Sequence, residues 1–122
     1  MQACDHIIIV DDDPSILKAV ARLLRREGYK PVPFSSVTAF KANAELERAA
    51  CVILDINLQD GSGIELRQYL NASRADVPVI FITGNEEPAV RQAALNAGCV
   101  ALVSKPFSAS ELLVPIKKAV GA

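Results

Sequence analysis

Residues 52–58 read Val-Ile-Leu-Asp-Ile-Asn-Leu, an almost uninterrupted apolar run with an aspartate, Asp55, inside it. A second stretch, Ile-Ile-Ile-Val-Asp-Asp at residues 7–12, also passes from branched aliphatic residues into acidic ones. Strands without polar alternation are typical of a parallel sheet that helices cover on both faces. The two stretches therefore predict buried parallel strands that lead into carboxylates.

Outward from these stretches, short apolar segments alternate with longer helical patterns along the whole chain. The expected strands are His6–Val10, Lys30–Phe34, Cys51–Leu54, Val77–Ile82 and Ala101–Val103. The five expected helices run from Pro14 to Glu27, from a cap at Ser35 or Ser36, from the loop at 59–63, from Glu86 to Ala97, and from Ser108. Five such units cannot close an eight-stranded barrel, so the predicted fold is α/β with an open, doubly wound sheet. Such sheets bind ligands at the carboxyl ends of their strands.

The composition is that of one ordinary domain spanning residues 1–122, and Met1 is expected to be a true N-terminus. Lys and Arg number 13 against 14 Asp and Glu, which argues against a nucleic-acid-binding domain. No apolar run is long enough to cross a membrane. Three cysteines, Cys4, Cys51 and Cys99, fit neither a zinc spacing nor a disulfide framework, so reduced thiols in the cytoplasm are expected.

Polar groups follow four of the five expected strands. Asp11, Asp12 and Asp13 follow the first, Asp55 ends the third, Thr83 follows the fourth and Lys105 follows the fifth. Because parallel strands end at one edge of the sheet, these groups are expected to meet. Clustered carboxylates favour a hard divalent cation such as Mg²⁺ or Mn²⁺. A lysine and a hydroxyl beside them are suited to binding a phosphoryl group.

Each of these residues also has an ordinary structural explanation when it is taken alone. Asp13 before Pro14 is the pattern of a helix cap, and Asp55 at a strand end is a common turn residue. Thr83 could cap a helix, and Lys105 could be a surface charge. Only their joint occurrence at successive strand ends favours a functional cluster.

Four motifs resemble those of the bacterial response-regulator receiver family, which includes the single-domain chemotaxis regulator. They are residues 7–12, residues 52–58 with Asp-Gly-Ser-Gly at 60–63, Ile-Phe-Ile-Thr-Gly at 80–84, and Val-Ser-Lys-Pro-Phe at 103–107. The resemblance covers essentially the whole chain. It implies a flavodoxin-like, five-stranded sheet with strand order 2-1-3-4-5 and five helices.

The resemblance also implies a role for each matching residue. Asp55 would be the phosphoacceptor, Asp12 would bind Mg²⁺ directly, and Asp11 would complete the acidic pocket through a metal-bound water. The main-chain carbonyl of Asn57 would be a further metal ligand. Lys105 would pair with Asp55 and then with the phosphoryl oxygens, which Thr83 and the Gly84 amide would also bind. The peptide bond between Lys105 and Pro106 would be cis.

In the same way, the resemblance implies partners and a mechanism of switching. The phosphodonor would be a phosphohistidine on a sensor histidine kinase or a histidine phosphotransfer protein, and the chain would not be a turnover enzyme. No binding to nucleic acid or membrane is expected. The output would be an attached domain or a homodimer, and the chain would be a single-domain regulator or the first domain of a transcription factor. Leu102 stands where many relatives have an aromatic switch residue, so Thr83 is expected to carry more of the switching.

Three other classes of protein share parts of this pattern. A haloacid-dehalogenase-like phosphatase needs a second acid two residues after its nucleophile, but that position holds Asn57. A nucleotide-binding flavodoxin-like protein would need a glycine-rich phosphate loop, which the sequence lacks. A degenerate receiver would have lost acceptor-site residues, but all five side chains are present.

Three further features leave alternatives open. Lys18, Arg22, Arg25 and Arg26 give the first helix a basic face, which either docks a partner helix or is an ordinary solvated face. Leu95, off the apolar stripe of its helix, is either a partner contact or an isolated surface leucine. Pro115 lies within the last helix and predicts a kink there or an early end to the helix.

Overall fold

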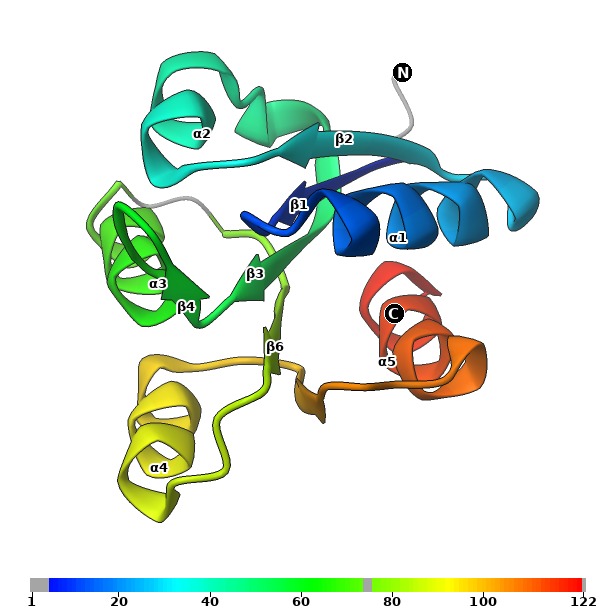
Figure 1. The fold of residues 1–122 in the computed structure, drawn as a ribbon. Helices are drawn as coiled ribbons and strands as arrows, with labels where there is room; N and C mark the ends of the chain where they lie inside the picture. Colours follow the sequence, from blue (N-terminus) through cyan, green and yellow to red (C-terminus); the bar gives the residue numbers. More distant parts are fainter. Residues whose placement is uncertain (1–4, 74–75, 122) are drawn as a thin grey trace.

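The computed structural model describes residues 5–73 and 76–121, so the expectations for Met1 and Cys4 lie outside the described residues. Its centre is a sheet of five parallel strands (Figure 1). The strands are β1 (His6–Val10), β2 (Lys30–Phe34), β3 (Ala49–Asp55), β6 (Val79–Thr83) and β7 (Ala101–Ser104). Their order is β2-β1-β3-β6-β7, which is the expected 2-1-3-4-5.

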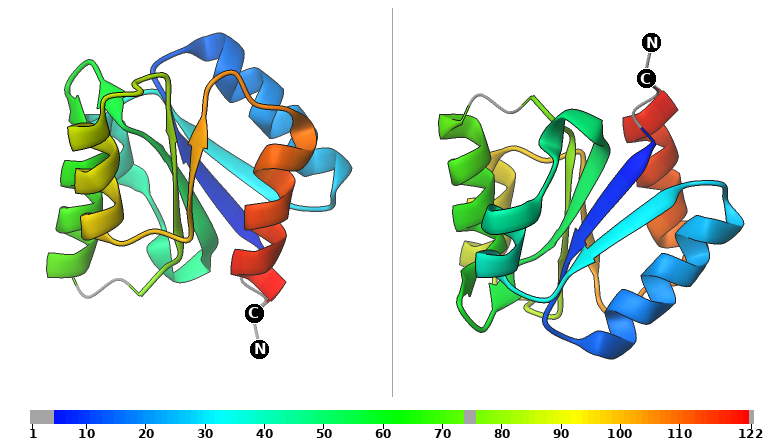
Figure 2. Two further views of the ribbon diagram at one scale, coloured as in Figure 1. Left: turned by 90° about the horizontal axis from the view of Figure 1, so that it is seen from below. Right: turned by 90° about the horizontal axis from the view of Figure 1, so that it is seen from above.

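Five helices cover the two faces of this sheet (Figure 2). They are α1 (Pro14–Arg26), α2 (Val37–Asn43), α3 (Gly63–Ala72), α4 (Pro88–Ala97) and α5 (Ala109–Gly121). Alternate residues of β1 point to opposite faces: Ile7 and Ile9 pack with α1 and α5, whereas Ile8 and Val10 pack with α2, α3 and α4. The doubly wound α/β fold expected from the apolar strands is therefore confirmed.

Several helix ends follow the chemistry that their sequences predict. Asp13 caps α1 by accepting a hydrogen bond from the Ser15 amide, and Ser108 and Glu111 form a reciprocal capping pair before α5. Gly28 ends the first helical segment with φ of 87°. In the described part of the chain, no helix has the length and apolar character needed to cross a membrane.

Some elements were not expected, or begin at other residues. A short 3₁₀ helix (Leu46–Arg48) precedes β3, and β4 (Asn57–Leu58) pairs antiparallel with β5 (Gly61–Ser62) in a small hairpin. Helix α4 begins at Pro88 instead of Glu86. The Asn85 side chain accepts a hydrogen bond from the Glu87 amide and holds this segment in a turn, and proline is favoured at a first helical position. Leu95 on α4 is 55% exposed, which suits both of its interpretations.

The last helix excludes one of the two outcomes expected at Pro115. Helix α5 does not end early at Pro115 but continues through it to Gly121. Pro115 is buried together with Leu112 and Ile116, so packing against the sheet offsets the missing hydrogen bond. The carbonyl left without a partner belongs to Glu111, an exposed residue that water can reach.

We expect Pro115→Ala to stabilise the protein. Alanine restores the backbone donor and is favoured over proline by about 3 kcal/mol inside a helix. The loss of two buried methylene groups costs about 1.6 kcal/mol, which leaves a net gain of about 1 kcal/mol. Urea unfolding of both proteins measures the difference, and a variant less stable than the parent would contradict the prediction.

Candidate functional site

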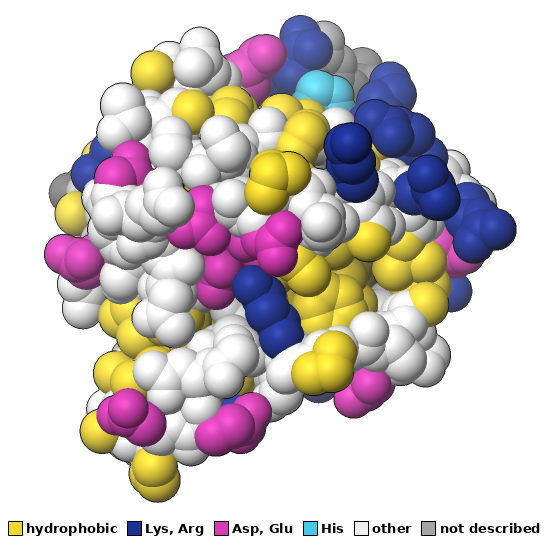
Figure 3. Space-filling model, in the orientation of Figure 1, with side chains coloured by type: hydrophobic (Ala, Val, Ile, Leu, Met, Phe, Trp, Pro, Cys, Tyr) yellow, Lys and Arg dark blue, Asp and Glu magenta, His cyan; other side chains and the backbone are white. Residues whose placement is uncertain are grey.

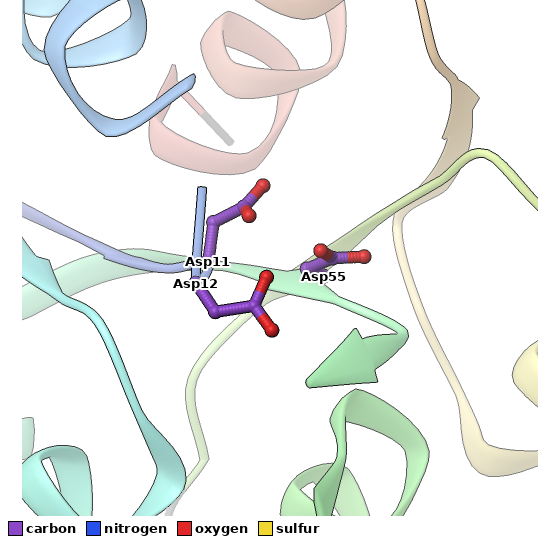
Figure 4. Close-up of side chains that lie close together, drawn as sticks. All are labelled: Asp11, Asp12 and Asp55. Atoms are coloured by element: carbon purple, nitrogen blue, oxygen red, sulfur yellow. The ribbon is translucent and has the colours of Figure 1, made fainter. Parts of the chain in front are cut away.

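Three aspartates lie together at the carboxyl edge of the sheet (Figure 4). Asp11 and Asp12 follow β1, and Asp55 is the last residue of β3, the neighbouring strand. One carboxylate oxygen from each lies within 4.8 Å of the others. Asp11 and Asp55 are buried, with exposures of 0% and 4%, while Asp12 is half-buried. The topology thus brings together the three carboxylates that the sequence had placed at strand ends.

Lys105 joins this cluster from the loop that follows β7. Its Nζ donates hydrogen bonds to Asp11 Oδ2 at 2.9 Å and to Asp55 Oδ2 at 3.0 Å. The lysine therefore bridges the two buried carboxylates. The sequence had predicted its contact with Asp55 but not its contact with Asp11. The peptide bond between Lys105 and Pro106 is cis, as expected.

Burial and neighbouring charges shift the pKa values of Asp55 and Lys105. Burial raises the pKa of Asp55 to about 6; the hydrogen bond from Lys105 opposes this, and the negative charge of Asp11 adds to it. Burial acts to lower the pKa of Lys105, but its hydrogen bonds to Asp11 and Asp55 outweigh burial and raise it. At neutral pH the site therefore holds a charged lysine and an aspartate that ionises at unusually high pH.

Backbone amides of the loop after β3 bind two of the carboxylates. The Asn57 amide donates to Asp55 Oδ1 at 3.2 Å, and the Gln59 amide donates to Asp12 Oδ2 at 3.0 Å. Asn57, the expected source of a carbonyl ligand, is exposed and opens the β4–β5 hairpin directly after the cluster. The hairpin therefore connects Asp12 and Asp55, which come from different strands.

Two residues that position this loop were missed as site residues. Asp60 accepts hydrogen bonds from the Val37 amide at 2.9 Å and from the amide and hydroxyl of Thr38, which ties the loop to the start of α2. Gly63 packs so closely on β3 that an added Cβ would overlap the carbonyl oxygen of Asp55. The available signal was the Asp-Gly-Ser-Gly stretch, because a glycine opening a helix directly after a strand indicates close backbone approach.

Thr83 stands at the same edge but makes a different contact. It is fully buried, and its Oγ1 accepts a hydrogen bond from the Asn85 amide at 2.9 Å. Within the described residues its hydroxyl has no hydrogen bond to the carboxylates. Its carbonyl accepts from the Lys105 amide at 2.8 Å, which places β6 and β7 side by side at the site. Exposed Gly84 follows Thr83.

Leu102, the residue at the expected aromatic switch position, is half-buried on β7 and packs on the α4 side of the sheet.

The cluster as a whole matches what a scan of family models finds. The response regulator receiver domain model matches residues 7–117, which include all three aspartates, Thr83 and Lys105. The chain belongs to the response regulator receiver family. This finding confirms the recognition made from the four motifs, and it favours a receiver over the dehalogenase-like and nucleotide-binding alternatives.

Curated relatives of this receiver domain include response regulators from several bacteria. It is 34% identical over 113 residues to the response regulator protein TmoT of Ectopseudomonas mendocina and equally similar to TodT of Pseudomonas putida. These matches cover 93% of this chain but only 51% and 50% of the relatives. RegA of Rhodovulum sulfidophilum is 32% identical over 106 residues, which are 87% of this chain and 58% of RegA. The chain thus spans about half the length of these relatives.

Solved structures agree with the fold of this receiver domain. A CheY-like receiver domain protein from Methanospirillum hungatei JF-1 is 30% identical, with a TM-score of 0.86 over 96% of this chain and 94% of that one. The BeF3-activated DrrB receiver domain is 29% identical, with a TM-score of 0.87 over 96% of this chain and 97% of that one. The response regulator StyR matches 95% of this chain with 59% of its own.

The raised pKa of Asp55 predicts how Asp55→Asn changes stability with pH. The pKa of Asp55 is about 6 in the folded protein, against an ordinary value of 3.8. Protonated Asp55 therefore favours the folded state, and this contribution is complete below about pH 4 and is lost as the pH rises through 6. Without divalent cations, Asp55→Asn should therefore be more stable than the parent at pH 7.5, by up to about 3 kcal/mol. The advantage should shrink towards pH 4.

Asp60→Asn is the matched control for this experiment. Amide hydrogen bonds from Val37 and Thr38 lower the pKa of Asp60, so its contribution is present above pH 4 and its removal should destabilise the protein at pH 7.5. Urea unfolding at both pH values separates the two variants. An Asp55→Asn variant less stable than the parent at pH 7.5 would contradict the burial argument.

Proposed function

We propose that this receiver domain accepts a phosphoryl group on Asp55 from a phosphohistidine, in the presence of Mg²⁺ or Mn²⁺. The observation that carries the proposal is the contact of Lys105 Nζ with Asp11 and Asp55 beside the Asp12 carboxylate. An oxygen of Asp55 attacks phosphorus as the bond from phosphorus to the histidine nitrogen breaks, and the electron pair of that bond stays on the imidazole. With a pKa of about 6, Asp55 is largely ionised at pH 7 and able to attack.

The donor groups at the site suit a hard cation. Three carboxylate oxygens within 4.8 Å of one another are the ligand type that Mg²⁺ and Mn²⁺ prefer. We assign Asp12 and Asp55 as direct ligands, Asp11 as a ligand through water, and the Asn57 main-chain carbonyl as a further ligand. The cation would offset the negative charge that otherwise repels an incoming phosphoryl group.

Lys105 would act before and after the transfer. Its two hydrogen bonds hold Asp11 and Asp55 in place before the transfer, and a phosphoryl group on Asp55 would offer the lysine oxygens that compete with Asp55 Oδ2. The ammonium is then free to pair with the new phosphoryl oxygens, and Thr83 and the Gly84 amide would bind these oxygens from β6. Because an acyl phosphate hydrolyses readily, the domain would act as a timed switch and not as a turnover enzyme.

The partners follow from this chemistry and from the relatives. A cytoplasmic sensor histidine kinase or phosphotransfer protein would supply the phosphohistidine. The chain spans about half of TmoT and TodT and 59% of StyR, so we propose that the receiver controls an output domain, directly or through an activated homodimer.

The phosphoacceptor assignment predicts a specific labelling result. With Mg²⁺ and a small acyl phosphate donor, the intact protein should gain one phosphoryl group, as seen by mass spectrometry and Phos-tag gels. Asp55→Asn and removal of the metal with EDTA should each abolish the gain. Asp76→Asn, which changes an exposed carboxylate outside the cluster and outside the loop after β3, should still be labelled. Labelling that survives in Asp55→Asn would refute the assignment.

The Thr83 contact predicts how the signal leaves the site. The Thr83 hydroxyl accepts from the Asn85 amide and keeps its own proton to donate, so a hydroxyl that turns towards a phosphoryl oxygen would pull on Asn85 and on the loop before α4. Thr83→Ala should still bind beryllofluoride at Asp55 but show much smaller amide shifts at residues 84–97. Thr83→Ser, which retains the hydroxyl, should respond like the parent. Equal shifts in the Ala variant at equal occupancy would exclude Thr83 as the coupling residue.

A further inference from the structure

A groove of about 790 Å³ runs between α1 and the edge strand β2, on the side of α1 away from α5. Figure 3 shows Lys and Arg side chains gathered on the face where Figure 1 places α1 and β2. Apolar side chains of Pro14, Leu17, Ala21 and Pro33 line this α1–β2 groove, and its basic residues are Lys18, Arg22, Arg25 and Arg26. It therefore combines an apolar surface with four positive charges.

These four charges are not neutralised within the described part of the chain. None of the four side chains takes part in an ion pair or a hydrogen bond there, and no acidic residue lines the groove. Of the 13 basic residues in the sequence, these four leave nine against 14 acidic ones elsewhere. The rest of the chain therefore carries a net negative charge, which disfavours an extended polyanion such as DNA or an anionic membrane. A smaller acidic partner fits the groove better.

The edge strand determines which backbone structure can occupy the groove. In β2, the Lys30 amide donates to the Asp5 carbonyl and the Phe34 carbonyl accepts from the Asp11 amide, so these residues face β1. By strand alternation, Pro31 and Pro33 face outward, and neither has an N–H group. An added strand would therefore find no donors on this edge. Because only the carbonyls of these prolines are left to pair, an occupant that binds through its side chains, as a helix does, is favoured over an added strand.

We propose that the α1–β2 groove binds an acidic, amphipathic helix of a partner protein. Its apolar residues would contact Leu17, Ala21 and Pro33, and its carboxylates would pair with the basic residues along α1. The prolines disfavour strand addition, and the charge excess favours an acidic helix over a neutral one. This proposal does not rest on the phosphoacceptor assignment, because the groove contains no residue of the acidic cluster.

The probe is a synthetic helical peptide about 15 residues long, with leucines on one face flanked by glutamates. Titrated into the ¹⁵N-labelled chain, it should shift amides mainly within residues 14–26 and 33–35. A second peptide with glutamine in place of every glutamate should bind at least about tenfold more weakly. Raising the salt concentration from about 0.05 to 0.5 M should weaken the binding of the acidic peptide and leave the affinity of the glutamine peptide nearly unchanged.

Two double variants test the location. Arg22→Glu/Arg25→Glu reverses charge inside the groove, whereas Lys41→Glu/Lys118→Glu makes the same change at exposed positions outside it. The first should lose at least about tenfold in peptide affinity, and the second should lose less than about twofold. Both should still be labelled by the acyl phosphate donor at Asp55, which separates this test from that of the proposed function.

Four results would overturn the proposal. They are no amide shifts at about 1 mM peptide, shifts centred outside residues 14–35, equal binding of the glutamine peptide, and unchanged affinity in Arg22→Glu/Arg25→Glu. Anionic phospholipid vesicles and duplex DNA are the competing occupants. Stronger groove shifts with either of them than with the acidic peptide would show that the occupant is wrongly assigned.

Discussion

Three carboxylates within 4.8 Å of one another, with one lysine among them, are the constraint on which this structure depends. Like charges at this distance repel, and burial of Asp11 and Asp55 removes much of the water that would screen them. Lys105 can balance only one unit of charge. The edge therefore keeps a negative excess that a bound cation would offset, while burial, with the charge of Asp11 adding to it, raises the pKa of Asp55.

The sheet makes this unfavourable arrangement possible. Asp55 ends β3, the central strand, whose residues from Cys51 to Leu54 are all buried and pack on both faces. Burial at about 25 cal/mol per Å² of apolar surface supplies far more stability than the cluster removes. The loop after β3 is held in place by two further contacts. Asp60 accepts hydrogen bonds from amides at the start of α2, and Gly63 lies in close contact with the Asp55 backbone.

Much of this could be predicted because it depends on strand order and strand ends. Apolar runs identify the strands, and parallel pairing places Asp11, Asp55 and Lys105 at one edge without knowledge of their contacts. Side-chain partners could not be predicted in the same way. The bond from Lys105 to Asp11 depends on how far a flexible side chain reaches, and the continuation of α5 through Pro115 depends on tertiary packing that overrides local preference.

The route from the site to the surface also follows from packing at β7. Because Leu102 is aliphatic and packs on the α4 side, it offers no ring or polar group that could exchange positions in response to a charge at Asp55. Arg91 instead supplies polar contacts between α4 and the site's surroundings, because its Nη1 lies 3.4 Å from Ser104 Oγ and 3.5 Å from Glu86 Oε2. Glu86 belongs to the loop that Thr83 holds through Asn85, and Ser104 precedes Lys105. In the proposed mechanism, Thr83 and Lys105 both act on the phosphoryl group, so they would move the two partners of Arg91 together and thereby α4.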